Sequence, residues 1–208
     1  MVMANGAIYT GEWEGNKRGG KGIQEWPDGS CYVGMWANDM ANGFGKLVHA
    51  DGDVYEGDWA DDKAHGLGKY IHANGAVYEG EWKADKQHGR GIEHWPDGAH
   101  YEGMFANGSK EGEGFLFFSD GSTYEGSFKK NENNGYGIYK WFDGKVYTGE
   151  WKANRMDGEG HLVWPDGREY KGSFTNDKRD GLGEYVWKDG RRYKGDWKMG
   201  KQHGIGWF

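Results

Sequence analysis

Hydrophobic and polar residues alternate along short stretches that recur through the whole chain. In residues 76–82, one face would carry Tyr78, Gly80 and Trp82, while the other carries a valine and two glutamates. A period of two predicts a β-strand with one buried face. Residues 89–95 are predicted as the return strand, and Asp97-Gly98 as the turn into the next repeat, so the pattern predicts a β-hairpin.

This hairpin pattern returns every 23 residues, nine times, without an insertion or deletion. The repeats start at Tyr9, Tyr32, Tyr55, Tyr78, Tyr101, Tyr124, Tyr147, Tyr170 and Tyr193. Glycine follows each tyrosine after two residues, and Trp or Phe after four. Because a slip of one residue would turn all later side chains to the other face, the constant period predicts constant geometry. We therefore predict a single array over residues 1–208.

The predicted fold is all-β: a single-layer, elongated antiparallel sheet of tandem β-hairpins, like a solenoid rod. With strands about 4.8 Å apart, nine hairpins would extend roughly 80–90 Å. Glycine recurs every few residues, which disfavours helices. One loop position holds only Asn, Asp or Gly, as at Asp85, which indicates a left-handed backbone there.

Aromatic residues of successive repeats must pack on one another, because a single layer has no second layer to cover them. The glycines between them would leave room for neighbouring rings. An open aromatic patch usually marks a binding site, so we predict a partner-binding groove along this face. Its residues are Tyr32, Trp36, Tyr55, Trp59, Tyr78, Trp82, Tyr101, Phe105, Tyr124, Phe128, Tyr147, Trp151, Tyr170 and Phe174.

The opposite face is predicted to be solvated, because acidic residues such as Glu56 and Glu79 lie beside the tyrosines. Two apolar clusters interrupt it. They are Cys31, Val33 and Met35 in the second repeat and Met104, Phe115 and Phe117 in the fifth. Drift of the repeat sequence would explain these clusters; the alternative is a second contact surface.

Candidate chemistry is scarce. His65 and His88 occupy equivalent positions, predicted as loop, in adjacent repeats, roughly 10 Å apart, which is too far to share a metal ion whose bonds are about 2 Å long. His49 and His72 fill an aromatic slot and are expected to be planar packing groups. The glycine pairs have no helix N-terminus to bind phosphate. We expect no metal, no cofactor, no catalytic residues and no enzyme activity.

Composition narrows the partners. The 40 glycines suggest low complexity, but 13 tyrosines, 12 tryptophans and 9 phenylalanines favour a folded protein. A formal net charge of -7 without a basic block argues against nucleic acid and weakens the case for a membrane surface. A single cysteine and the absence of a long apolar run favour a soluble intracellular protein.

The spacing of Tyr-x-Gly-x-Trp, His-Gly-x-Gly and Asp-Gly resembles the MORN repeat (membrane occupation and recognition nexus) across essentially the whole chain. Residues 55–68 and 78–91 fit this pattern well. The departures are Phe105, Phe128 and Phe174 in place of Trp, and Glu111, Asp157 and Asp180 in place of His. The resemblance implies a scaffold of a large assembly that binds a partner helix or an extended peptide along its aromatic groove.

We therefore expect a non-enzymatic scaffold or adaptor in a cytoskeletal assembly, of which ciliary or flagellar axonemes and radial spokes are the examples that the resemblance implies. The alternatives are a peripheral membrane adaptor that binds phosphoinositides and a regulatory module of an enzyme complex. The chain stops inside the last predicted hairpin, and end strands carry unpaired backbone groups. A homodimer or an end-to-end contact between copies is accordingly expected too.

Overall fold

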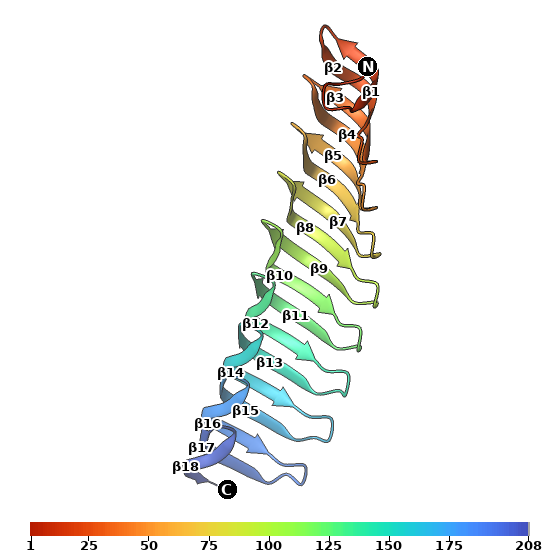
Figure 1. Ribbon diagram of the computed structural model, residues 1–208. Coiled ribbons are helices and arrows are strands. Elements are labelled where there is room, and N and C mark those ends of the chain that lie inside the picture. Colours follow the sequence, from red (N-terminus) through yellow and green to blue (C-terminus); the bar gives the residue numbers. More distant parts are fainter. Residues whose placement is uncertain (208) are drawn as a thin grey trace. The chain divides into compact units, whose positions relative to one another are not determined.

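The computed structural model describes residues 1–207 and forms two compact units. The N-terminal unit comprises Met1–Gly108 and the C-terminal unit Ser109–Phe208. Within each unit the strands follow one another in chain order, and each pairs antiparallel with its neighbours in the sequence (Figure 1). The predicted all-β fold of tandem hairpins in one layer is confirmed, whereas the length of the array and its description as one domain stay predictions.

The strands alternate between a first strand of seven residues and a return strand of nine, except in the last hairpin, where both strands have seven residues. Those of the N-terminal unit are β1 (Ile8–Glu14), β2 (Lys17–Glu25), β3 (Cys31–Ala37), β4 (Met40–Val48), β5 (Val54–Ala60), β6 (Lys63–Ile71), β7 (Val77–Lys83), β8 (Lys86–His94) and β9 (His100–Ala106). Those of the C-terminal unit are β10 (Ser109–Phe117), β11 (Thr123–Lys129), β12 (Glu132–Lys140), β13 (Val146–Lys152), β14 (Arg155–Val163), β15 (Glu169–Thr175), β16 (Lys178–Val186), β17 (Arg192–Lys198) and β18 (Lys201–Trp207). Residues 1–207 contain no helix long and apolar enough to cross a membrane.

Two-residue loops join the strands of one hairpin. Ala84 and Asp85 have φ angles of 49° and 67°, and every equivalent loop from residues 38–39 onward also has positive φ at both positions, whereas the first loop has it at Gly15 but not at Asn16. Positive φ at both central residues defines the type I′ turn, whose twist matches that of the strands. The predicted left-handed position is therefore confirmed in every hairpin except the first. The tight loop also corrects one expectation: the return strand starts earlier than predicted, so His65 and His88 lie in β6 and β8 rather than in loops.

A row of tyrosines forms the core of each unit, and each ring lies against glycines of its own hairpin. Tyr78 is 1% exposed, and its hydroxyl donates a hydrogen bond to the Glu81 carbonyl at 2.9 Å. Gly80 and Gly91 face each other across the two strands. A Cβ atom on Gly91 would lie only 2.6 Å from Cε2 of Tyr78. The glycines thus make room first for the tyrosine of the same repeat, whereas the sequence predicted room for the rings of neighbouring repeats.

The rings of successive repeats form an edge-to-face series within each unit. Tyr78 contacts Trp82 at a centroid distance of 5.2 Å and Phe105 of the next repeat at 5.0 Å, with interplanar angles of 89° and 86°. Such T-shaped pairs stabilise by about 0.5–1.5 kcal/mol beyond the burial of area. Trp82 also donates from Nε1 to the Gly68 carbonyl at 3.1 Å. The prediction that aromatic residues of neighbouring repeats pack together is confirmed.

Candidate partner-binding groove

Most rings of the predicted groove lie deep in the inner face, which we define as the face that carries the tyrosine row. Its seven predicted tyrosines are at most 2% exposed. The rings of Trp36, Trp59, Phe105, Phe128, Trp151 and Phe174 are 3–9% exposed, and Trp82 is half-buried. These residues therefore support the floor of the inner face. Their contact with a partner stays a prediction.

A second layer of aromatic side chains, which we call the accessible layer, lies on the inner face and is more exposed than the tyrosine row. Tyr70 belongs to it, because it pairs with Tyr55 and Tyr78 on the flanking strands. The half-buried rings of the accessible layer are Trp26, Tyr70 and Trp95 in the N-terminal unit and Phe118, Tyr139, Trp141, Trp164 and Trp187 in the C-terminal unit. The sequence indicated aromatic side chains at several of these positions. How exposed these side chains are depends on how deeply the tyrosine row is buried.

In the C-terminal unit the accessible layer contains two clusters of rings in contact. Tyr139 contacts Trp141 at a centroid distance of 4.5 Å and lies 5.8 Å from Trp151 of the floor. In the same way, Tyr185 contacts Trp187 at 4.8 Å and Trp164 at 5.9 Å. Because each ring rests on another, the exposed aromatic surface is held in a fixed arrangement.

Three cations cover the tryptophans of this layer. Lys145 Nζ lies 4.1 Å from the ring centroid of Trp141, and Arg168 Cζ lies 5.4 Å from that of Trp164. Arg191 Cζ lies 5.8 Å from the ring of Trp187. The equivalent positions of earlier repeats hold Ala7, Ser30, Asp53, Ala76, Ala99 and Ser122. Sequence reasoning missed these cations, although Lys or Arg two residues before the tyrosine in three successive repeats was a readable signal.

The turn aspartates hold the two arginines in place. Arg168 donates from Nε to both carboxylate oxygens of Asp166, at 3.0 and 2.8 Å. Arg191 donates from Nε to Asp189 at 2.8 Å. The Arg168 side-chain hydrogen bond lowers the pKa of Asp166, and at Asp189 the backbone N–H of Arg191 is the main cause of a lowered pKa. The side chains of Arg168 and Arg191 remain 41% and 75% exposed.

In the N-terminal unit, polar side chains interrupt the accessible layer. Tyr70 donates its hydroxyl to Asp53 Oδ2 at 2.6 Å, and His72 Nδ1 lies 3.4 Å from the same oxygen. The hydrogen bond from Tyr70 is the largest cause of the lowered pKa of Asp53. The rings of Tyr70 and His72 lie 4.7 Å apart and are tilted by 56°, so His72 packs against an aromatic neighbour. Across residues 1–207, no group of three or more His, Cys, Asp or Glu side chains could hold a metal ion.

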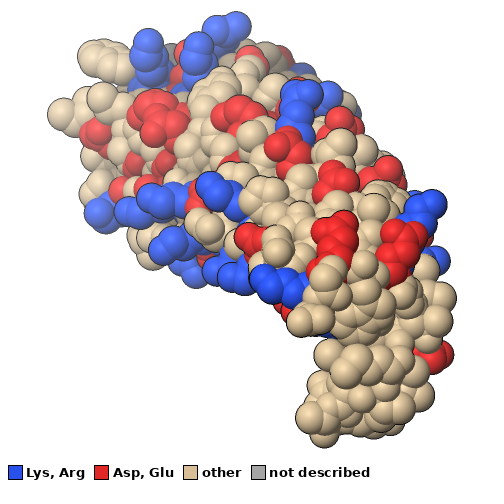
Figure 2. Space-filling view, turned by 90° about the horizontal axis from the view of Figure 1, so that it is seen from above, with Lys and Arg blue, Asp and Glu red and all other residues tan. Residues whose placement is uncertain are grey.

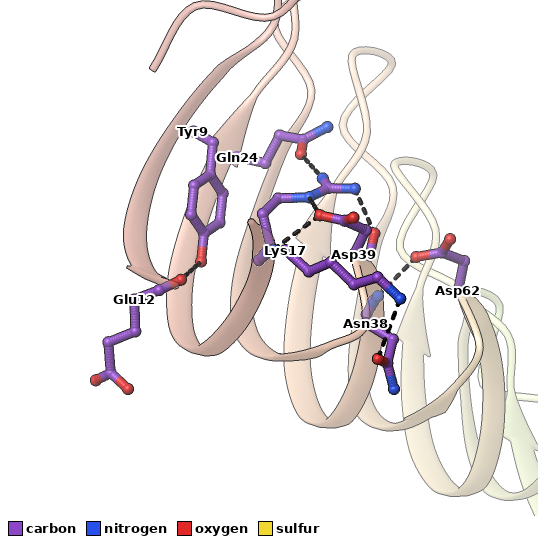
Figure 3. Close-up of polar contacts among 9 residues, drawn as sticks. Tyr9, Glu12, Lys17, Gln24, Asn38, Asp39 and Asp62 are labelled. Carbon is purple, nitrogen blue, oxygen red and sulfur yellow. Dashed lines mark hydrogen bonds and ion pairs between the residues drawn. The ribbon is translucent and has the colours of Figure 1, made fainter. Parts of the chain in front are cut away.

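Hydrogen bonds join the loops of successive repeats at the strand ends, along one side of the sheet. Asp62 Oδ1 accepts a hydrogen bond from the Ala41 N–H at 2.6 Å, and the Asp62 N–H donates to the Ala41 carbonyl at 3.0 Å. Asp39 accepts from the Arg18 N–H at 2.8 Å in the same manner (Figure 3). Sequence analysis identified the turn role of these residues but missed this ladder, because the partner lies 21 residues earlier.

An apolar cluster lies on the outer face, opposite the tyrosine row. Val33 and Met35 are 48% and 36% exposed. An open pocket of about 540 Å³ is lined by Thr10, Lys21, Gly22, Ile23, Val33, Gly34, Met35 and Phe44. Cys31 is half-buried nearby in β3, and burial raises the pKa of its thiol. In the fifth repeat Met104 is 39% exposed, and Phe115 and Phe117 are half-buried. The second contact surface stays a prediction.

Charge is unevenly distributed between the two halves of the sequence. The N-terminal unit is strongly acidic, whereas in the C-terminal unit Lys and Arg nearly balance Asp and Glu. Figure 2 shows basic side chains interspersed with acidic ones on the face in view. The three cations described above are distinguished by their regular placement over tryptophans.

Tandem hairpins in one layer, with an aromatic core repeated at a constant period, define an open-sheet repeat protein. The chain belongs to the MORN repeat family, which it matches over residues 9–31, 32–54, 55–77, 78–100, 101–123, 124–146, 147–167, 170–191 and 193–208. A comparison with curated proteins gave no match.

Solved structures with a similar fold come from the protein CPAP. The wild-type TCP10 domain of Danio rerio CPAP aligns with a TM-score of 0.50 and 13% identity, covering 94% of this chain and 92% of that one. The G-box domain of the microcephaly protein CPAP gives 0.46 and 14%, covering 86% and 100%. The SAS-4 (dCPAP) TCP domain of Drosophila melanogaster, solved in complex with a proline-rich motif of Ana2, gives 0.44 and 17%, covering 74% and 85%. At these identities the likeness concerns the fold alone.

Proposed function

We propose that this protein is a non-enzymatic scaffold or adaptor that holds a partner helix or extended peptide along its inner face. The main observation that supports this proposal is the accessible layer of aromatic rings that rests on the buried tyrosine row. Its members are fixed by ring contacts such as Tyr139 with Trp141 at 4.5 Å. Rigid aromatic side chains with one accessible edge are the residues that dominate binding hot spots. A protein segment laid across them would bury this edge without reorganising the floor.

A large cytoskeletal assembly is the setting we propose, with a ciliary or flagellar axoneme as its narrower form. The support for this setting is the uniform 23-residue pattern and the Trp-Pro-Asp-Gly turns that begin at Trp26, Trp95 and Trp164. Imaging the tagged protein in ciliated cells tests it. A distribution that excludes cilia and other cytoskeletal structures would contradict the setting while leaving the groove proposal intact.

Quantitative affinity capture tests the groove. We expect the full chain to retain a defined set of partner proteins, and the exchange Trp141→Ser to reduce their recovery by about tenfold, because an exposed aromatic anchor is typically worth 1–2 kcal/mol or more. The matched control is Tyr136→Ser in the neighbouring strand β12, since Tyr136 is 61% exposed and lies on the outer face. Circular dichroism checks whether both variants stay folded. Equal recovery by the two variants would contradict the proposal.

The apolar cluster on the outer face is proposed as a second contact surface of the same scaffold. Its support is the open pocket bordered by Val33 and Met35. The capture experiment extends to Val33→Asp, which should remove a partner that Trp141→Ser leaves in place. If Val33→Asp removes no partner, the proposal fails, and the apolar cluster reflects drift of the repeat sequence.

A further inference from the structure

The accessible layer of the C-terminal unit has a regular spacing set by its strands. Trp141, Trp164 and Trp187 each follow a return strand, namely β12, β14 and β16, and one further strand lies between each pair. Two inter-strand spacings of about 4.8 Å place successive tryptophans roughly 9.6 Å apart. A ligand that contacts all three in the same way must repeat its own surface at this distance.

We propose that the inner face of the C-terminal unit binds an acidic, proline-rich segment of a protein partner in the polyproline II conformation. This proposal deepens the proposed function and rests on it. A polyproline II helix has three residues per turn and rises about 3.1 Å per residue, so every third side chain returns to the same side after about 9.3 Å. That period nearly equals the spacing of the tryptophans. Aromatic-lined grooves favour such segments, because the ligand is already extended before it binds.

Other backbone conformations fit this spacing less well. An α-helix advances about 9.6 Å in roughly 6.4 residues, which is less than two full turns, so equivalent side chains would rotate away from successive tryptophans. A β-strand advances that far in about three residues and would present alternate faces to neighbouring slots. Only the three-residue period keeps one edge of the ligand on the aromatic layer and another on the cations.

The cations specify the chemistry of the second edge. Lys145, Arg168 and Arg191 recur at the same 23-residue interval as the tryptophans that they cover. The hydrogen bonds to Asp166 and Asp189 engage Nε of each arginine. The terminal guanidinium nitrogens are further donors, and their planar geometry suits a carboxylate. An acidic residue at every third position would meet one cation per turn, while the prolines between them pack on the tryptophans.

Fluorescence anisotropy with labelled synthetic peptides tests this assignment on the full 208-residue chain. The probe is (Pro-Pro-Glu)4. The comparison peptides are (Pro-Pro-Lys)4, a peptide with the composition of the probe and its glutamates clustered, and an alanine-rich helical peptide with four glutamates. We expect the probe to bind most tightly, and the clustered and lysine peptides to bind at least about tenfold more weakly.

Matched triple variants locate the site. K145A/R168A/R191A removes the three cations of the inner face and should weaken binding of the probe by about tenfold. K140A/K171A/K194A removes three exposed cations from the outer face of the same unit and should change the affinity by less than about twofold. The thermal midpoint of both variants, followed by circular dichroism, reports whether the fold is retained.

Each outcome separates the inference from the proposed function. Tighter binding of the helical peptide, dependent on Trp141, would overturn the polyproline assignment and leave the groove intact. Equal binding of the regular and clustered peptides, or equal effects of the two triple variants, would also overturn it. If no peptide binds, the inference fails, and the capture experiment with Trp141→Ser decides the proposed function independently.

Discussion

At the scale of single residues, the glycines of this protein meet different structural requirements, and two kinds differ clearly. One kind lies beneath a tyrosine ring, as Gly91 does beneath Tyr78. The other kind occupies a turn with positive φ and open space around it, as at Gly98, where φ is 90°. The first is required by contact with a ring and the second by the backbone alone.

Alanine substitutions in one repeat distinguish the two kinds. Gly91→Ala should lower the free energy of unfolding by about 3 kcal/mol, because the new methyl group displaces the Tyr78 ring from a filled core. Gly98→Ala should cost about 1 kcal/mol, since only a left-handed backbone opposes it. Urea titrations followed by circular dichroism measure both. Equal losses would mean that the ring has room to move.

How far the sequence determines the site is also visible at this scale. The alternation around Tyr78 and the constant period were sufficient to predict the hairpins and the packing of the rings. Neither predicted that the tyrosines would be buried while Trp141 and Trp164 stay accessible, because that depends on the ring lying flat on two glycines. The cations at Lys145 and Arg168 were missed for a simpler reason: Lys or Arg occupies this position only in the last three repeats, so the signal is absent from the pattern shared by all nine.

At the scale of elements, the loop ladder joins one hairpin to the next. Asp62 combines a φ of 64° with a side-chain hydrogen bond to the Ala41 N–H. Asn154 makes the equivalent bond to the Asn133 N–H at 2.8 Å, with the same φ of 64°. Asp62 and Asn154 therefore combine two separate features, a left-handed backbone and an acceptor oxygen, whereas Gly108 and Gly200 at equivalent positions supply only the first.

A substitution series at Asp62 separates these features. Asp62→Asn should be nearly neutral, because it keeps both features. Asp62→Gly should lose about 1 kcal/mol for the missing hydrogen bond, and Asp62→Ala about 1 kcal/mol more for the left-handed backbone. Urea denaturation ranks the variants. A glycine variant as stable as the wild type would show that the ladder contributes nothing to stability.

At the scale of the whole molecule, the tyrosine rows make stability depend on alkaline pH. Burial is the main cause of the raised pKa of Tyr32, Tyr55, Tyr78, Tyr124 and Tyr147. In the unfolded chain the same groups ionise near pH 10. Their contribution to stability is therefore fully present below about pH 10 and is lost as the pH rises toward the native pKa values.

Titration with base tests this prediction by following tyrosinate absorbance together with the β-sheet signal in circular dichroism. We expect most of the tyrosinate absorbance to appear together with the loss of the β-sheet signal, because the buried hydroxyls ionise only on unfolding. Full ionisation with an unchanged β-sheet signal would show that the rows open to solvent without unfolding.

The edge-to-face series has a consequence for how such a protein can change in length. Tyr124 contacts Trp151 of the next repeat, and Tyr147 contacts Phe174 in turn. Removing residues 147–169 would delete one full period and bring Tyr124 beside Phe174, so the new junction would reproduce an existing one. The deletion would also remove Trp164 and Arg168, so the core packing would be kept while the inner face would lose one tryptophan and its cation. If the polyproline proposal holds, the shortened protein would hold one turn fewer of its partner.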